Sequence, residues 1–220
     1  MNKRRSQASF VTDDVAINFL NTAANAAGGR VDAVGDGRSF LDWLRTAGLV
    51  SEEVRLKCER AHGSAKINEA AAEARALRTW LRGFVDARGH ERPRALKASQ
   101  LEPLNRILRR GESFEQIVVH LQGGVRAREA PLVRELRERL RSPHALLVPV
   151  ARSIAKLVCG DQFADVRTCN GGGCTLMFID RTRARRRQWC SMSTCGNRAK
   201  VRAHRNRKVV DTAPTVGKAF

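Results

Sequence analysis

Apolar side chains recur at helical spacing through most of the first 159 residues. In the segment AAAEARALRTWLRGFVDAR they follow the i, i+3, i+4, i+7, i+8 spacing of a helix with one buried face, at Leu77, Trp80, Leu81, Phe84 and Val85. Start and stop signals predict further helices between Ser39, as N-cap, and Gly48, from Ser51, after Ser99, and from Ser142-Pro143 to Gly160. The pattern therefore predicts a mainly α fold.

The helical pattern of apolar residues is interrupted once before residue 160 and is lost beyond it. Ile117, Val118 and Val119 favour a strand, and Gly123-Gly124 offers the turn of a small β-hairpin. We expect helix again over Leu132–Leu140. Beyond residue 160, TLMFID is predicted as a strand and GNRAKVRAHRNRK as a terminal helix that lacks an apolar stripe.

The distribution of charge divides the chain. Lys and Arg number 41 against 22 Asp and Glu, a net charge of +19, which is typical of polyanion binders but also accompanies GC-rich coding bias. Residues 160–220 hold 13 cations and 4 anions, whereas residues 1–159 hold 28 and 18, so the net charge per residue roughly doubles after residue 160. We expect a mostly helical domain over residues 1–160, a small basic module over residues 161–210 and a tail over residues 211–220.

The N-terminus has no apolar run of the length of a secretory signal, and no segment holds ~18 uninterrupted apolar residues. We therefore expect a cytoplasmic protein without a membrane partner. In a reducing compartment, clustered cysteines are more often metal ligands or redox groups than disulfides.

Four of the six cysteines form two C-x4-C pairs, Cys169 with Cys174 and Cys190 with Cys195, separated by 15 residues. This layout is typical of a structural Zn²⁺ site made from two knuckles, in which four thiolates complete a tetrahedral shell and leave no position for a catalytic water. Gly171 to Gly173 fit a knuckle because glycine permits positive φ angles. Two disulfides or an iron–sulfur cluster would suit the same spacing, so zinc is the favoured cofactor among alternatives.

Between the cysteine pairs, the segment DRTRARRRQW gathers five guanidinium groups that repel one another. Such a loop suits phosphates, which accept bidentate hydrogen bonds from arginine, although charge runs are usually only solvated. We expect nucleic-acid contacts from this loop and the segment after it: Arg183, Arg185, Arg186, Arg187, Asn197, Arg198, Lys200, Arg202 and Arg205. Trp189 is interpreted as a packing residue and Asp180 as a structural partner of an arginine or a backbone amide.

Residues 169–202 resemble the CGNR zinc finger, named for the tetrapeptide that is Cys195-Gly196-Asn197-Arg198 here. The chain departs from the family's D-x-S-R-N-R-x-R-R-W-C stretch at Thr182, Ala184 and Gln188. Upstream, INFLNTAANAAGGRVD, FLDWLRTAGL, LNRILRRG and PVARSIAKLV are similar to the domain that usually precedes this finger, a stress-induced transcription regulator. The resemblance implies that the four cysteines bind zinc and that the basic residues contact DNA.

The favoured interpretation is a DNA-binding transcriptional regulator whose helical domain senses a small-molecule effector or pairs subunits in a homodimer. An RNA-binding protein that uses the same basic module is the alternative. The common nucleotide-binding, hydrolase and metalloprotease motifs are absent from the sequence, so we do not expect an enzyme. Asn21 and Thr22 could hydrogen-bond a ligand, but we favour a role in satisfying the backbone of a neighbouring loop.

Overall fold

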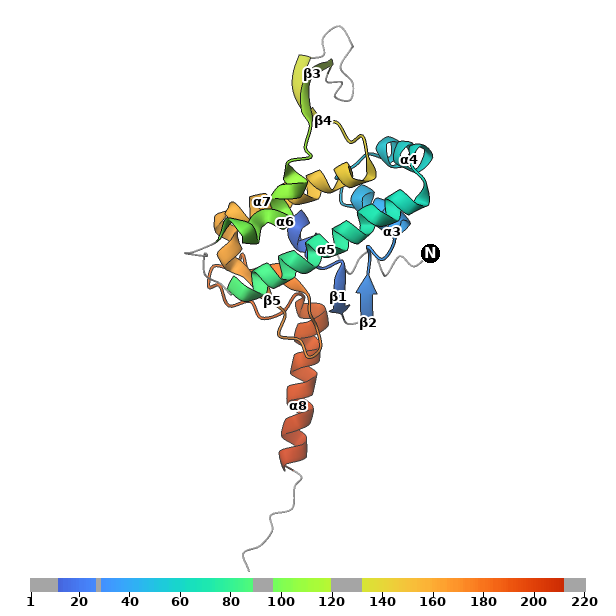
Figure 1. Cartoon of the computed structure of the whole chain (residues 1–220). Helices are drawn as coiled ribbons and strands as arrows, with labels where there is room; N and C mark the ends of the chain where they lie inside the picture. The colour runs from blue at the N-terminus through green and yellow to red at the C-terminus, as the bar shows by residue number, and fades with distance from the viewer. Residues whose placement is uncertain (1–11, 27–28, 89–96, 120–131, 212–220) are drawn as a thin grey trace, which may run out of the picture. The chain divides into compact units, whose positions relative to one another are not determined.

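The computed structural model describes residues 12–26, 29–88, 97–119 and 132–211. The chain divides into two compact units, which consist of helices and small antiparallel strand pairs (Figure 1). The first unit comprises Met1–Ala33, Leu81–Pro93 and Leu157–Phe220, and the second comprises Val34–Trp80 and Arg94–Lys156. The predicted mainly α fold with a small hairpin and a C-terminal cysteine module is confirmed. The predicted boundary at residue 160 stays a prediction.

The second unit contains most of the helices that the apolar pattern predicts. Its elements are α3 (Gly37–Thr46), α4 (Glu52–Ala61), the first part of α5 (Ser64–Arg88), α6 (Ala98–Leu108), β3 (Ser113–Val119), β4 (Leu132–Glu138), the 3₁₀ turn η1 (Pro143–Leu147) and most of α7 (Val148–Cys159). Its fully buried side chains include Phe40, Leu41, Leu44, Ile107, Leu146, Leu147 and Ile154. These apolar faces supply the unit with a core of its own.

Local hydrogen bonding sets where the helices begin. Helix α4 starts after Ser51 as predicted, since the Ser51 hydroxyl accepts the Val54 N–H. The predicted N-cap at Ser39 is wrong. Asp36 caps α3 instead, and Ser39 completes a capping box by accepting the Asp36 N–H at 3.0 Å. Helix α6 begins at Ala98, one residue before Ser99.

The expected helix over Leu132–Leu140 is wrong, because Leu132–Glu138 forms strand β4. This strand pairs antiparallel with β3 in a register that places Val119 opposite Leu132. Leu132 and Leu136 share a face in a helix, four residues apart, and equally in a strand, where every second side chain shares a face. The β-branched residues of β3 decide between the two by offering a pairing partner. Gly123 and Gly124 lie outside the described residues.

The first unit joins the N-terminal segment to the cysteine module. Its elements are α2 (Val15–Leu20), β1 (Ala23–Ala26), β2 (Gly29–Asp32), the ends of α5 and α7, the 3₁₀ turn η2 (Asp161–Asp165), β5 (Val166–Thr168), β6 (Met177–Ile179), the π-helical turn η3 (Met192–Gly196) and α8 (Asn197–Asp211). Strand β6 and helix α8 confirm the predictions for TLMFID and the terminal basic segment. The β1–β2 hairpin and strand β5 were not predicted.

Hydrogen bonds tie the N-terminal segment to the chain between Cys174 and β6. The buried Asn21 side chain donates to the Met177 carbonyl and accepts from the Met177 N–H, both at 2.8 Å. Asn25 and Thr175 exchange two further bonds through the Asn25 main chain. Arg82 of α5 donates to the carbonyls of Leu20 and Thr175. Asn21 therefore acts like a partner strand for one residue of β6.

Replacement of Asn21 by Ala should destabilise the first unit. The N–H and C=O of Met177 would both lose their partner in a buried position, and we expect the free energy of unfolding to fall by about 2–4 kcal/mol. Asn25→Ala is the matched control, because the exposed Asn25 bonds to Thr175 through its main-chain N–H and C=O, which the substitution keeps. Denaturant unfolding of both variants measures the difference. Equal stability of the two would contradict this role of Asn21.

Candidate metal centre

The four clustered cysteines come together although they lie on four different local structures. Cys169 follows β5, Cys174 precedes β6, Cys190 follows the arginine-rich loop and Cys195 lies in η3. Their Sγ atoms all lie within 4.8 Å of one another, with 3.9 Å between Cys174 and Cys190 and 3.7 Å between Cys190 and Cys195. A tetrahedron with metal–sulfur bonds of ~2.3 Å has edges of ~3.8 Å. The arrangement fits a single tetrahedral metal ion.

The geometry separates the alternatives that the spacing left open. All six cysteines are free thiols, and the Sγ–Sγ distances of 3.7 and 3.9 Å around Cys190 are far longer than the ~2.05 Å of a disulfide. In a four-iron cluster each thiolate binds a different iron, which holds the sulfurs farther apart than one shared ion does. The four cysteines therefore form a metal-binding group for one ion, and their closed shell suits a structural role.

The thiols differ in their electrostatic surroundings. Burial raises the pKa of Cys174 to about 11, and it also raises the pKa of Cys190. Burial acts in the same direction on Cys169, but N–H groups of Cys190 and Gly171 donate to its Sγ and bring its pKa below the ordinary value. Two backbone hydrogen bonds thus stabilise the Cys169 thiolate without any metal.

Gly171 to Gly173 make the first knuckle sterically feasible. A Cβ on Gly171 would lie 2.9 Å from Sγ of Cys195, and one on Gly172 would lie 2.9 Å from Nη1 of Arg202. Gly173 adopts a φ of +76°, in the left-handed region that favours glycine. Gly171 and Gly173 are therefore the glycines that the knuckle requires, because the flexible end of Arg202 can shift to admit a Cβ on Gly172, and the predicted positive φ occurs at Gly173.

A small apolar core surrounds the sulfur atoms. Leu176 and Phe178 pack with the cysteines, and Trp189 is half-buried against this cluster, as its interpretation as a packing residue requires. Ala24 of β1 belongs to the same cluster. The N-terminal hairpin therefore completes the core of the metal centre, a contribution that no spacing in the sequence indicates.

Asp180 organises the arginine-rich loop from a fully buried position. Its Oδ1 accepts the N–H and hydroxyl of Thr182, and its Oδ2 accepts the N–H of Arg187 at 2.9 Å. Burial raises the pKa of this carboxyl, but these hydrogen bonds outweigh burial and hold the pKa below its ordinary value. Asp180 therefore remains a carboxylate at neutral pH, and its hydrogen bonds to Thr182 and Arg187 fix the loop between these two residues.

The arginines of this loop fall into two groups. Arg187 lies over the Phe178 ring at 4.4 Å and donates to the carbonyls of Trp189 and Cys190, and Arg185 pairs with Asp165 at 2.9 Å. Arg181 lies 3.6 Å from Asp13. By contrast, Arg183 and Arg186 are exposed and have no hydrogen bond or ion pair among the described residues. Arg183 and Arg186 could therefore contact nucleic acid without first breaking an intramolecular bond to a described residue.

Helix α8 lines a groove of about 630 Å³ beside the first knuckle. The groove is bounded by Gly171 to Gly173, by Ala26 and by α8, from which Asn197, Arg198, Arg202 and Arg205 line it. Three of these are arginines at i, i+4 and i+7, on one face of the helix. Lys200 is exposed but does not line the groove, and the Asn197 amide donates to the Ser193 carbonyl.

The other predicted site residues lie away from this groove. Both amide atoms of Asn21 bond to Met177, and the Thr22 hydroxyl donates to the Phe19 carbonyl at 2.6 Å. Their geometry matches the structural role that we favoured, and ligand binding by this pair stays a prediction. In the sequence, the hydrogen bonds of Asn21 to Met177 of β6 were indicated only by the position of a polar pair within an apolar run.

Two family models match the chain. The ABATE model, described as "Putative stress-induced transcription regulator", matches residues 13–161, and the CGNR zinc finger model matches residues 166–208. Their order agrees with the resemblance read from the sequence. No curated protein matches the chain. Among the described residues, no helix has the length and apolar character needed to cross a membrane.

The contrast between Arg187 and Arg186 gives a direct test of the loop. Arg187→Gln removes hydrogen bonds to two carbonyls beside Cys190 and the contact with Phe178, and we expect a loss of about 1–3 kcal/mol of stability. Arg186→Gln, with the same change of charge, should alter stability by less than about 0.5 kcal/mol. Thermal unfolding of the metal-loaded variants measures both. If Arg186→Gln were as destabilising as Arg187→Gln, the placement of the two side chains would be wrong.

Proposed function

This chain belongs to the ABATE family of stress-induced transcription regulators and carries a CGNR zinc finger, and from this we propose that it is a zinc-containing transcriptional regulator that binds DNA. One observation carries the proposal: the cysteine group lies directly beside a groove that three arginines of α8 line. Cys195 belongs to the metal-binding group, and Asn197, two residues later, begins the helix. A metal bound there fixes the start of α8 and so the position of its cations.

We propose that the metal is zinc. Four thiolates with near-tetrahedral spacing form a closed shell, which is the usual arrangement of structural zinc sites. Zinc bound by Cys169, Cys174, Cys190 and Cys195 supplies a cross-link that such a small apolar core cannot provide by itself. The protein groups supply the rest: the Cys190 and Gly171 N–H groups orient Cys169, and the glycines let the first knuckle approach Cys195.

The nucleic-acid contact surface combines the groove with the exposed loop arginines. Arg198, Arg202 and Arg205 lie on one face of α8, and Arg183 and Arg186 project from the loop without intramolecular partners among the described residues. Guanidinium groups held apart at fixed points match the regular phosphates of a duplex better than a mobile charged tail does. Four further predicted residues contribute less directly. Intramolecular bonds hold Asn197, Arg185 and Arg187, which shape the surface, and the exposed Lys200 adds positive charge to it.

A groove in the second unit supports sensing of a small effector. It has a volume of about 570 Å³ and lies beside α4, with Val54, Phe114, Leu140 and Pro149 as its apolar lining. Glu138 also lines it, and Oε2 of this residue is buried without a hydrogen-bond partner among the described residues. An effector with an apolar body and a hydrogen-bond donor would suit this groove.

Protein purified without added metal should contain one equivalent of zinc per chain. The double variant Cys174→Ser/Cys195→Ser removes one ligand from each knuckle and should lose the metal, because two thiolates do not complete a closed shell. Cys58→Ser/Cys159→Ser is the matched control, since these cysteines lie outside the cluster. Elemental analysis measures all three proteins. Bound iron in the parent, or full zinc in the first variant, would refute the assignment.

The groove arginines should make phosphate contacts that depend on salt. Replacing Arg198, Arg202 and Arg205 by Gln should flatten the slope of log affinity against log salt by about 0.9 per lost contact, so by roughly two to three units for duplex DNA. Zinc content should not change, because the replaced residues are not ligands.

The control variant replaces the exposed Arg38, Arg60 and Lys66 by Gln, which removes the same charge from the second unit. Fluorescence anisotropy at several salt concentrations, with duplex DNA and structured RNA of matched length, gives the slopes. Equal slopes for the two triple variants would show that the groove face is merely solvated. Tighter binding of RNA than of DNA would favour the RNA-binding alternative.

A further inference from the structure

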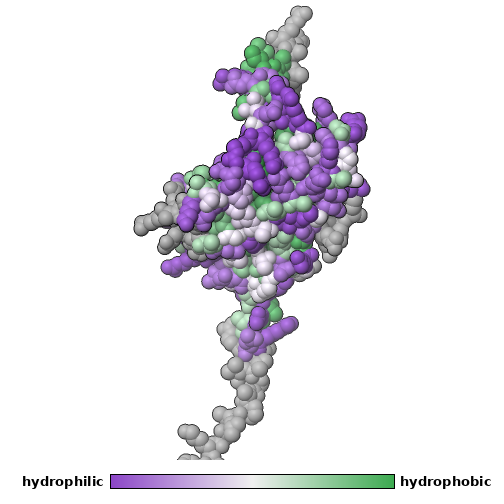
Figure 2. All heavy atoms as spheres, viewed as in Figure 1, coloured by the Kyte–Doolittle hydropathy of each residue, from purple (hydrophilic) through white to green (hydrophobic). Residues whose placement is uncertain are grey.

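The β3–β4 hairpin presents an apolar face to solvent. Alternate residues of a strand share a face, and so do cross-strand partners. The register therefore places six residues together, which we call the ribbon face: Glu115, Ile117, Val119, Leu132, Arg134 and Leu136. Figure 2 shows hydrophobic atoms gathered where Figure 1 places this hairpin.

The exposure of these side chains is unusual for an antiparallel sheet. Ile117, Leu132 and Leu136 are 72%, 70% and 65% exposed, and Val119 is 51% exposed. On the other face, Phe114, Gln116, Val118 and Glu135 are half-buried. Apolar side chains normally point into the core and polar ones outward, whereas here the more exposed face is the more apolar one. Contiguous exposed apolar surface of this kind marks an interaction site.

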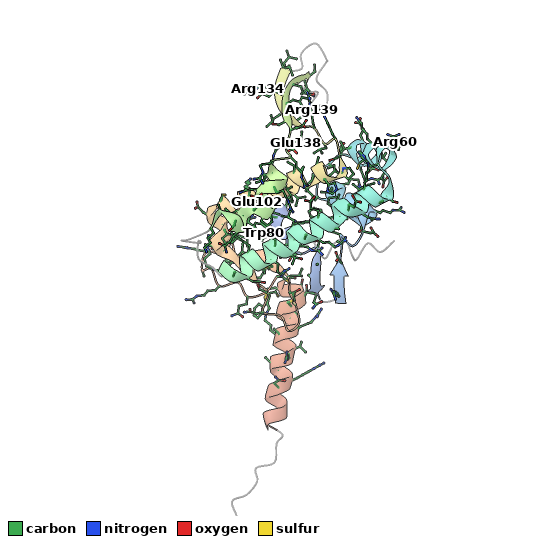
Figure 3. All side chains as sticks on the ribbon, in the orientation of Figure 1. Arg60, Trp80, Glu102, Arg134, Glu138 and Arg139 are labelled. Atoms are coloured by element: carbon green, nitrogen blue, oxygen red, sulfur yellow. The ribbon has the colours of Figure 1, made fainter. Side chains whose placement is uncertain are left out.

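The hairpin itself gains little stability within its unit. Within the described residues it is a sheet of two strands, so that each strand has an unpaired edge. An isolated two-stranded hairpin is at best marginally stable in water and needs a packed face. Its base is held by the ion pair of Arg152 with Glu138, while Arg134 lies farther along the hairpin, as Figure 3 shows. The outer part therefore depends on a partner for its packing.

We propose that the ribbon face is the homodimer interface and that it packs against the ribbon face of a second copy. The face carries charges of both signs, with Arg134 and Glu115 on opposite strands and 3.6 Å apart within one chain. A two-fold axis parallel to the strands would place β3 of one copy over β4 of the other. Each Arg134 then lies over Ile117 of the second copy, two residues from that copy's Glu115, and Val119 of each copy packs on Leu132 of the other.

Self-complementarity favours a second copy over an unrelated partner. A face with one sign of charge would repel its own copy, whereas each copy of this face carries one positive and one negative side chain that can approach the opposite charge of the other copy. The surface lies within the second unit and shares no residue with the proposed groove of α8. Variants of the hairpin therefore change the proposed interface without changing any residue of the groove.

Charge-swapped variants test the interface. Glu115→Arg leaves only positive charge on the ribbon face and Arg134→Glu leaves only negative charge, so each variant alone should dimerise at least about tenfold more weakly than the parent. A mixture of the two should form heterodimers with affinity within about threefold of the parent. Sedimentation velocity and native mass spectrometry measure the self-association of each variant and the formation of heterodimers. The protein is first treated with nuclease and washed at high salt to remove bound nucleic acid.

An apolar variant supplies a second measurement. Ile117→Glu/Leu132→Glu should abolish the dimer and keep the helical circular dichroism of the parent, because both side chains are exposed in the single chain and neither lies on a helix. Leu56→Glu on α4, at a residue that is 40% exposed, is the control and should leave dimerisation unchanged. A parent that stays monomeric at ~100 μM would overturn the proposal. So would a dimer that persists in the glutamate variant, or variants that show no preference for each other.

Discussion

The convergence of four cysteine sulfurs within 4.8 Å is the constraint on which the C-terminal half of the first unit depends. Each sulfur is held by a different local structure, and only a few apolar side chains pack around them. Leu176, Phe178 and Trp189 form only a small apolar core, so a metal ion bound by the four cysteines would stabilise the module as a cross-link. The Gly171 to Gly173 knuckle, the arginine-rich loop and the start of α8 are all positioned by this one group.

The metal centre is in turn completed by residues that precede it by about 150 positions. The Asn21 amide pairs with the main chain of Met177, and Ala24 enters the core around the sulfurs. The ABATE and CGNR matches thus describe two segments of sequence, whereas the first compact unit contains parts of both. The N-terminal segment and the metal centre are therefore joined by direct hydrogen bonds and by a shared apolar cluster.

The abundance of arginine also has a structural explanation. Arg187, Arg185 and Arg82 donate to main-chain carbonyls, and Arg187 also stacks on Phe178, so part of the positive charge stabilises the fold. These guanidinium groups satisfy carbonyls that irregular loops leave without strand partners. Within the part of the chain that the structure describes, Arg183 and Arg186 have no such partners, so they are available to an external anion together with the arginines along the groove of α8.

The sequence by itself determined the helical periodicity, most helix limits and the four metal ligands, because each depends on residues within a few positions of one another. The predicted start of α3 at Ser39 was three residues late, because Asp36 caps this helix. Tertiary structure alone decided that Leu132–Glu138 is a strand, since its leucine spacing suits a helix and a strand equally and β3 supplies the pairing. It also decided which arginines are free and that Asn21 completes β6, because carbonyl acceptors 156 residues away leave no local pattern in the sequence.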